Sequence, residues 1–224
     1  MQPVQFALWL QFEEDIRRYS LSYEILTTLG GKLPEPERII ERGVRLRLNK
    51  DKASVTWTPT HCFITSENVS DKKHCIDRII SVLEIINRVA TIEKLSDRRY
   101  ITYWILPTLQ YDFVSLERKY RETMIAQNDV SNTAYDSSTI FDIRGDKWIL
   151  HHQSGPMEPQ QLQQTRLRFK LDNMPKTFIF LEASTMDNNV IQYSRGEMHS
   201  FMERSLENCV SHMEECNRIW EGRL

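Results

Sequence analysis

The chain has 224 residues, of which 40% are hydrophobic and 27% are charged. This composition excludes a disordered or fibrous protein, and the length is sufficient to bury a substantial core. The formal net charge of −2 gives no whole-protein attraction to nucleic acid or to anionic lipid. We expect no signal peptide and no membrane span, and the four cysteines form no dense disulfide framework, which predicts a cytoplasmic protein.

Hydrophobic periodicity divides the first half of the chain into strands and helices. Apolar and polar residues alternate in the predicted strands, and apolar residues recur at helical spacing in the predicted helices. The predicted segments are a strand over 4–12, a helix over 20–29, a short helix from Pro34 to about Gly43, a hairpin over 44–48 and 53–58, a helix over 72–89 and a strand over 99–106. Without the short helix, the order is β-α-β-β-α-β, which is that of a ferredoxin-like unit.

The second half contains a weaker pattern of the same kind. Its predicted segments are a charged helix over 112–125, a polar loop over 128–138, a hairpin over 139–143 and 147–152, a strand over 177–182 and a long final helix. Ser194 and Glu197 match a capping box, which predicts that this helix begins at Ser194. The predicted order of the second half is α-β-β-β-β-α.

An internal echo links the two halves. Arg45–Leu48 opens a strand, turn, strand and helix, and Arg166–Phe169 opens a similar series, with its turn at Asp172–Pro175. The echo predicts an α+β protein of two ferredoxin-like or related halves, 1–110 and 111–224. Each half is expected to carry long amphipathic helices on one face of an antiparallel sheet.

Histidines and cysteines provide the first candidate site. His61–Cys62 and His74–Cys75 are adjacent pairs, and His212 lies four residues before Cys216 on the same helical face. Zinc prefers such nitrogen and sulfur ligands. Their spacing differs from a compact zinc knuckle, however, and most of the cysteines fall beside apolar stripes, where a thiol packs as a small hydrophobe. We therefore expect no metal and no cofactor.

The catalytic candidates are confined to one predicted hairpin. His151 and His152 are expected beside Asp142 and Asp146 across this hairpin, where a carboxylate can orient an imidazole as a general base. The chain has no nucleophile elbow, P-loop or dinucleotide-binding glycine pattern. Pairs of this kind also occur on solvated sheet faces, and we favour a non-catalytic protein.

A basic and aromatic segment provides an alternative site for RNA. Sheet-based RNA-binding proteins stack bases on aromatic side chains and contact phosphates with basic ones. The residues that match this chemistry are Arg98, Arg99, Tyr100, Trp104, Arg118, Lys119 and Arg121. The glycine-containing motifs of such proteins are absent. In a strand as apolar as this one, however, Tyr100 and Trp104 are expected most simply to face the helices or the neighbouring half.

Short motifs resemble those of a sporadically distributed prokaryotic family of uncharacterised proteins. They are Ile64–Ser66 before a long helix, Ile92–Leu95 after it, Arg98–Ile101 opening a strand, and Phe180–Glu182 before the closing helix. The resemblance implies two α+β halves and, through the scattered occurrence of the family, a role in defence or in mobile genes. It provides no catalytic residues, and Arg98 stands where the family pattern has an apolar residue.

The sequence thus favours a non-catalytic interaction subunit or regulator in a prokaryotic defence or stress system. Sheet edges and helices rich in tryptophan and methionine are expected to bind another protein chain, or a second copy of this one. The alternative is an RNA-binding or RNA-processing protein. A third hypothesis, hydrolysis of a small ligand, depends only on His151, His152 and Asp142.

Overall fold

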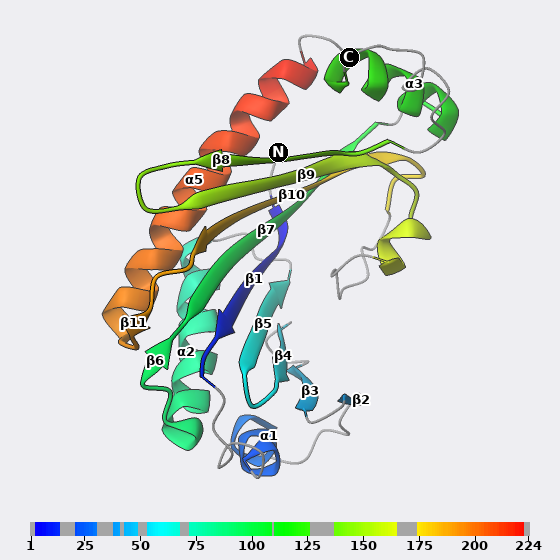
Figure 1. Ribbon diagram of the computed structural model, residues 1–224. Helices are drawn as coiled ribbons and strands as arrows, with labels where there is room; N and C mark the ends of the chain where they lie inside the picture. Colours follow the sequence, from blue (N-terminus) through cyan, green and yellow to red (C-terminus); the bar gives the residue numbers. More distant parts are fainter. Residues whose placement is uncertain are drawn as a thin grey trace. The chain divides into compact units, whose positions relative to one another are not determined.

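The protein is an α+β structure with predominantly antiparallel strand pairing (Figure 1). The computed structural model describes residues 3–13, 21–30, 38–40, 43–48, 53–67, 72–108, 110–125, 137–164 and 174–221. The strands are β1 (Pro3–Gln11), β2 (Arg38–Ile40), β3 (Gly43–Leu48), β4 (Ala53–Trp57), β5 (His61–Glu67), β6 (Lys94–Leu95), β7 (Asp97–Pro107), β8 (Thr139–Arg144), β9 (Ile149–Met157), β10 (Phe178–Asp187) and β11 (Ile191–Gln192). The helices are α1 (Ser22–Gly30), α2 (Lys72–Ala90), α3 (Phe113–Met124), the short 3-10 helix η3 (Gln161–Gln164) and α5 (Arg195–Glu221).

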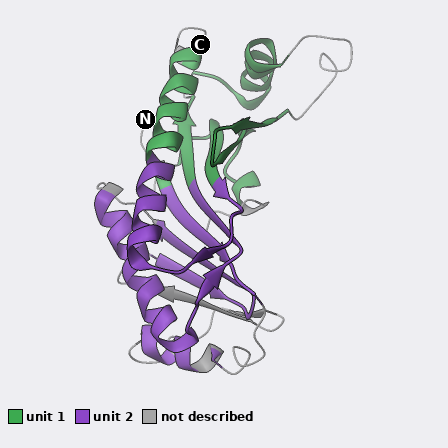
Figure 2. Ribbon diagram, turned by 60° about the vertical axis from the view of Figure 1, so that its left-hand side comes forward, with its two compact units in different colours: residues 1–4, 102–185, 207–224 green, residues 5–101, 186–206 purple. Residues whose placement is uncertain are grey.

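The chain forms two compact units (Figure 2). Unit 1 comprises residues 1–4, 102–185 and 207–224, and unit 2 comprises residues 5–101 and 186–206. This division differs from the predicted boundary between residues 110 and 111. It differs because the chain returns after Thr185 to contribute a further segment to unit 2, which no local sequence pattern reveals.

Unit 2 contains strands in the order β2-β3-β4-β5-β1-β7, and a separate short pair of β6 with β11. The predicted hairpin is confirmed, with Leu46 of β3 opposite Val55 of β4. Strand β1 pairs with β5 so that Leu8 lies opposite Ile64. The Leu8–Ile64 pair places two buried aliphatic residues across from one another, which is an arrangement that stabilises a sheet.

Two features of unit 2 differ from the sequence analysis. The short helix predicted up to Gly43 is wrong over Arg38–Ile40, which forms strand β2 and pairs with β3. Ile39 and Ile40 are β-branched and fit a strand better than a helix. Strand β5 also has no counterpart among the predicted segments, so the β-α-β-β-α-β order lacks both β2 and β5 before α2.

The core of unit 2 is built on the predicted stripe of α2. Its buried residues include Phe6, Leu8, Leu10, Trp57, Ile64, Ile76, Ile79, Ile80, Leu83, Ile86, Tyr100, Met198, Phe201 and Met202. The helical spacing of the buried isoleucines and of Leu83 in α2 gives one continuous apolar side. The periodicity of this helix was therefore a sufficient signal for both its type and its buried face.

One ion pair lies within unit 2, away from solvent. Arg98 is 4% exposed, and its Nη2 and Nε donate to Asp187 Oδ2 at 2.6 and 3.2 Å. The guanidinium carbon also lies 4.4 Å from the centre of the Phe201 ring. Burial acts to raise the pKa of Asp187, but the hydrogen bonds from Arg98 and Asn189 outweigh it and lower that pKa overall. Arg98 is thus held by a carboxylate and an aromatic face.

Unit 1 contains strands in the order β7-β10-β9-β8. The predicted hairpin is confirmed, with β8 and β9 antiparallel and Asp142 opposite His151. Gly145 lies in its turn, and a Cβ at this position would come within 2.7 Å of the Trp148 indole, so a larger residue would require that side chain to move. Gly145 also donates its backbone N–H to the carbonyl of Trp148 at 2.9 Å, closing the hairpin.

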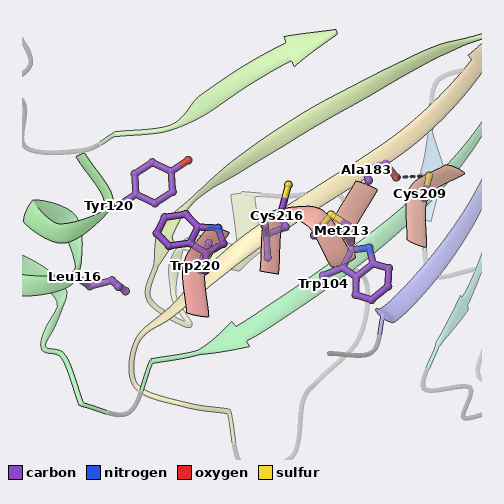
Figure 3. Packing of buried hydrophobic residues seen from close by; sticks show 10 residues of the cluster. Trp104, Leu116, Tyr120, Ala183, Cys209, Met213, Cys216 and Trp220 are labelled. Atoms are coloured by element: carbon purple, nitrogen blue, oxygen red, sulfur yellow. Dashed lines mark hydrogen bonds between the residues drawn. The ribbon is translucent and has the colours of Figure 1, made fainter. Parts of the chain in front are cut away.

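An aromatic and sulfur-containing core fills unit 1 (Figure 3). Its buried members are Trp104, Leu116, Tyr120, Ile179, Leu181, Ala183, Cys209, Met213, Cys216 and Trp220. The rings of Tyr120 and Trp220 stack at a centroid distance of 5.1 Å. Cys209 and Cys216 lie in this core, as the apolar stripe of the final helix predicted.

Caps fix the ends of the two helices that carry this core. The Asp112 carboxylate accepts a hydrogen bond from the Ser115 N–H at 2.8 Å and begins α3. The Ser194 hydroxyl accepts from the Glu197 N–H at 3.2 Å, which confirms the predicted cap before α5. The second copy of the internal echo at Arg166–Phe169 and most of the loop over 128–138 lie outside the described residues.

The buried ion pair predicts a large effect of one substitution on stability. Asp187→Ala leaves the Arg98 charge buried without its carboxylate, and we expect a loss of about 3–5 kcal/mol in the free energy of unfolding. Asp77→Ala is the matched control, because the Asp77 carboxylate pairs with His199 but is 52% exposed, so its loss should stay below about 1 kcal/mol. Urea denaturation measures both variants. Equal effects would show that the Arg98–Asp187 pair does not stabilise unit 2.

Candidate functional site

Three potential ligand residues meet in unit 1. His152 comes from β9, and His212 and Cys216 come from α5. His212 Nε2 lies 2.9 Å from His152 Nδ1 and 3.6 Å from Cys216 Sγ. The potential ligand atoms of all three residues lie within 4.8 Å of one another, and in the described part of the chain no other His, Cys, Asp or Glu group is so arranged.

Two local periodicities bring these side chains to the same place. On β9, burial alternates so that Leu150, His152 and Ser154 point into the core while His151 points to the opposite face. On α5, His212 and Cys216 are four residues apart and share one face. The sequence analysis identified His152 and the His212–Cys216 pair separately. It had no means of joining them, because 60 residues separate His152 from His212.

A chain of hydrogen bonds extends from the cluster toward α3. His152 Nε2 lies 2.7 Å from the Ser154 hydroxyl. The Tyr120 hydroxyl lies 2.8 Å from the same oxygen, donates to the Ser154 carbonyl at 2.8 Å, and lies 2.8 Å from the Thr139 hydroxyl. The Phe141 ring stacks on His152 at 4.5 Å between centroids. Polar and aromatic contacts together hold the His152 ring in one orientation.

Burial determines the protonation states of the cluster. It lowers the pKa of His152 to about 3, with smaller contributions from His212 and His151. It also lowers the pKa of His212 and raises the pKa of the Cys216 thiol to about 11. At neutral pH the cluster therefore consists of two neutral imidazoles and one protonated thiol. This state offers two nitrogen donors but no titrating base near pH 7 and no thiolate nucleophile.

The catalytic candidates are thus divided between two faces of the hairpin. His151 Nδ1 lies 2.8 Å from Asp142 Oδ1, and these side chains are 22% and 53% exposed. His152 is fully buried and has no carboxylate partner among its described hydrogen bonds. The His151–Asp142 pair is therefore a solvated pair across two strands, whereas His152 belongs to the buried cluster.

The RNA-binding candidates do not form one surface. Arg98, Tyr100 and Trp104 are 4%, 0% and 2% exposed. Arg98 pairs with Asp187, and the Trp104 indole N–H donates to Thr102 at 2.9 Å within the unit 1 core. Side chains buried in this way offer no face on which a base can stack. The apolar character of the strand had favoured burial of Tyr100 and Trp104, and both are buried.

The remaining basic candidates differ in exposure. The Arg99 guanidinium is half-buried and contacts the Met186 sulfur. Arg118 on α3 is exposed, whereas Lys119 and Arg121 on the same helix are half-buried. These residues do not share a patch with Arg98, Tyr100 and Trp104, because that group lies in the cores.

The other histidine–cysteine pairs do not converge on the cluster. Cys62 and Cys75 are buried in unit 2, and burial raises the pKa of both thiols, that of Cys75 to about 12. His61 bonds to the Thr58 hydroxyl at 2.8 Å. The expectation that cysteines pack as small hydrophobes therefore describes Cys62 and Cys75, while Cys216 combines core packing with two nearby imidazoles.

A second feature of unit 1 is an exposed apolar strand. Ile140, Phe141 and Ile143 of β8 are 59%, 36% and 40% exposed. Among the described residues, β8 pairs with β9 alone, so the described ladders leave its other edge unpaired. Exposed apolar residues on an unpaired strand are the usual conditions for pairing with another chain.

No protein-family model matches the chain, and no curated protein matches it. Among solved structures, the chain is similar to Methanococcus jannaschii TBP, with a TM-score of 0.29 and 10% sequence identity over 96% of this chain and 98% of that one. So low a TM-score carries no argument about fold or function. Separately, none of the described helices is sufficiently long and apolar to span a membrane.

The buried His152 predicts a stability change on mild acidification. In protein kept metal-free with EDTA, the unfolded chain takes up a proton on this residue near pH 6.5, whereas the folded chain does not until about pH 3. Stability is therefore highest above pH 6.5 and falls as the pH decreases, by about 2 kcal/mol at pH 5 from this residue. His152→Gln should remove this part of the pH dependence in urea denaturation at pH 7 and pH 5. An unchanged pH dependence in the variant would contradict the assignment.

Proposed function

We propose that this chain is a non-catalytic protein-interaction subunit that binds a partner protein through strand β8. The observation that carries the proposal is the row of exposed apolar side chains on a strand whose outer edge has no ladder partner among the described residues. A partner strand added there would form main-chain hydrogen bonds along the edge and cover Ile140, Phe141 and Ile143.

The two faces of β8 define the chemistry of the partner. Successive side chains alternate between faces, so Phe141 and Ile143 share one face, while Ile140, Asp142 and Arg144 share the other. The first face is apolar and the second carries one charge of each sign. We therefore infer an extended partner segment with apolar residues on one face and a Lys/Arg and an Asp/Glu on the other, since opposite charges across strands stabilise pairing.

The broader setting follows the sequence analysis. We propose two ferredoxin-like or related halves and a cytoplasmic location, and four free cysteines are usual in a reducing compartment. A role in a prokaryotic defence or stress system is supported only by the family resemblance. RNA binding is the alternative, and its support is now reduced to Arg99, Arg118, Lys119 and Arg121, since Arg98, Tyr100 and Trp104 are buried.

The interaction surface predicts the behaviour of one variant and its control. Ile140→Lys places a charge on the outer strand, and we expect it to weaken partner binding by about tenfold or more. Val114→Lys is the matched control, because Val114 is 58% exposed in the same unit but lies on α3, so it should bind as the parent chain does. Partners are captured from the native host with the parent chain, identified by native mass spectrometry, and their affinities for each variant compared.

Hydrogen exchange then locates the interface on the chain. In the complex, backbone amides of β8 should exchange more slowly than in the free protein. A captured polypeptide that leaves β8 exchange unchanged, or that binds Ile140→Lys as well as Val114→Lys, would overturn the proposal. A mass of two copies with β8 protected would identify a second copy as the occupant. Bound mass removed by nuclease, with β8 unprotected, would support RNA binding instead.

A further inference from the structure

We propose that His152, His212 and Cys216 form a binding site for one zinc ion, with two nitrogen ligands and one sulfur ligand. This inference is independent of the interaction surface on β8 and supplies a cofactor that the sequence analysis did not expect. The ligand atoms are His152 Nδ1, His212 Nε2 and Cys216 Sγ, which face one another inside unit 1.

The spacing of these atoms fits tetrahedral zinc. With Zn–N bonds of about 2.0–2.1 Å and a Zn–S bond of about 2.3 Å, tetrahedral ligands lie about 3.3 Å apart for two nitrogens and about 3.6 Å for nitrogen and sulfur. The observed separations are 2.9 Å between the nitrogens and 3.6 Å between His212 Nε2 and Cys216 Sγ. The third pair is within 4.8 Å. By side-chain rotation, the first separation must lengthen by about 0.4 Å and the third must shorten by up to about 1.2 Å, while the second already fits.

The surroundings of His152 prepare it as a ligand. Its Nε2 lies 2.7 Å from the Ser154 hydroxyl, so an Nε2–H donated to Ser154 leaves the lone pair on Nδ1 directed at His212 and Cys216. Tyr120 in turn contacts the Ser154 hydroxyl at 2.8 Å. A second hydrogen-bonded group behind a ligating imidazole is the common arrangement in metal sites, because it fixes the tautomer and the ring orientation.

The protonation states of the two histidines also favour metal binding at this site. Both imidazoles are neutral at pH 7, because burial lowers the pKa of each. The Cys216 thiol releases its proton to solvent when the Zn–S bond forms, and the cation compensates the thiolate charge that burial alone disfavours. The three protein ligands leave one tetrahedral position, which a water molecule takes in sites of this kind.

Cys209 is a second buried cysteine on α5, and its sulfur has no imidazole among its described hydrogen-bond partners. Its sulfur lies 3.5 Å from the Ala183 carbonyl and 3.7 Å from the Thr185 hydroxyl. It has the same buried position in the unit 1 core as Cys216, on the same helix, but it does not belong to the group of potential metal ligands. Cys209 is therefore the matched control for substitutions at Cys216.

Cobalt titration of the full chain tests the site directly. Metal-free protein is titrated with Co²⁺, whose absorption reports both tetrahedral geometry and a thiolate ligand, and Zn²⁺ binding is measured by calorimetry. We expect one ion per chain, a sulfur-to-cobalt charge-transfer band, and its displacement by Zn²⁺. Cys216→Ala should abolish that band, and His212→Ala should weaken Zn²⁺ binding at least about 100-fold, while Cys209→Ala should retain both properties.

The hydrogen-bonded support gives a second, graded test. Ser154→Ala keeps all three ligands and should weaken Zn²⁺ binding by about 10–100-fold. Circular dichroism and thermal melting of each metal-free variant show whether it is folded, so loss of binding is not confused with unfolding. Absence of a charge-transfer band in the folded parent protein, or its persistence in Cys216→Ala, would overturn the proposal. Loss of the band in Cys209→Ala as well would contradict the assignment of Cys216 as the thiolate ligand.

Discussion

The burial of one side of α5 is the constraint on which unit 1 depends. Cys209, Met213, Cys216 and Trp220 recur at intervals of three or four residues, and all are buried in one core. The polar residue His212 lies at the border of this stripe, so burial of the stripe places the His212 side chain at the edge of the core, where it is half-buried. The position of the candidate site is thus a consequence of core packing, because burial of the apolar stripe determines where His212 and Cys216 lie.

A buried polar group costs free energy unless it has partners, and each unit contains a set of buried polar side chains that contact one another. In unit 1, Tyr120, Ser154, His152 and His212 form a continuous series of short polar contacts. In unit 2, Arg98 is held between the Asp187 carboxylate and the Phe201 ring. The two solutions differ in charge. The ion pair is complete within the chain, whereas the neutral imidazoles and the thiol retain the capacity to bind a cation.

The β8–β9 hairpin relates the buried cluster to the exposed surface. Phe141 stacks on His152 with its ring, yet the residue is 36% exposed. Occupation of the cluster by a metal would hold His152 and, through this stacking, one residue of the outer strand. Since edge strands with apolar side chains pair readily with other chains, a rigid β8 would lose less conformational entropy when a partner binds.

The sequence by itself determined the elements whose signals are local. Periodicity predicted α2 and β7, the Ser194 cap predicted the start of α5, and Gly145 marked the turn of the hairpin. These features follow from backbone propensities and from contacts within a few residues, which a sequence displays directly. The short strand β2 was misread, because three residues next to prolines carry too little pattern to separate strand from helix.

Only the tertiary structure decided which side chains meet. His152 and His212 are 60 residues apart and Arg98 and Asp187 are 89 apart, and no local pattern encodes such pairs. The same limit applies to Tyr100 and Trp104 of β7, where residues 100–105 are all buried, because the sequence of a strand does not show which other elements cover its faces. The sequence therefore identified the chemical types present in the chain. Long-range packing determined which of them became core, which formed an ion pair and which formed a ligand cluster, because burial depends on what the rest of the chain places against each face.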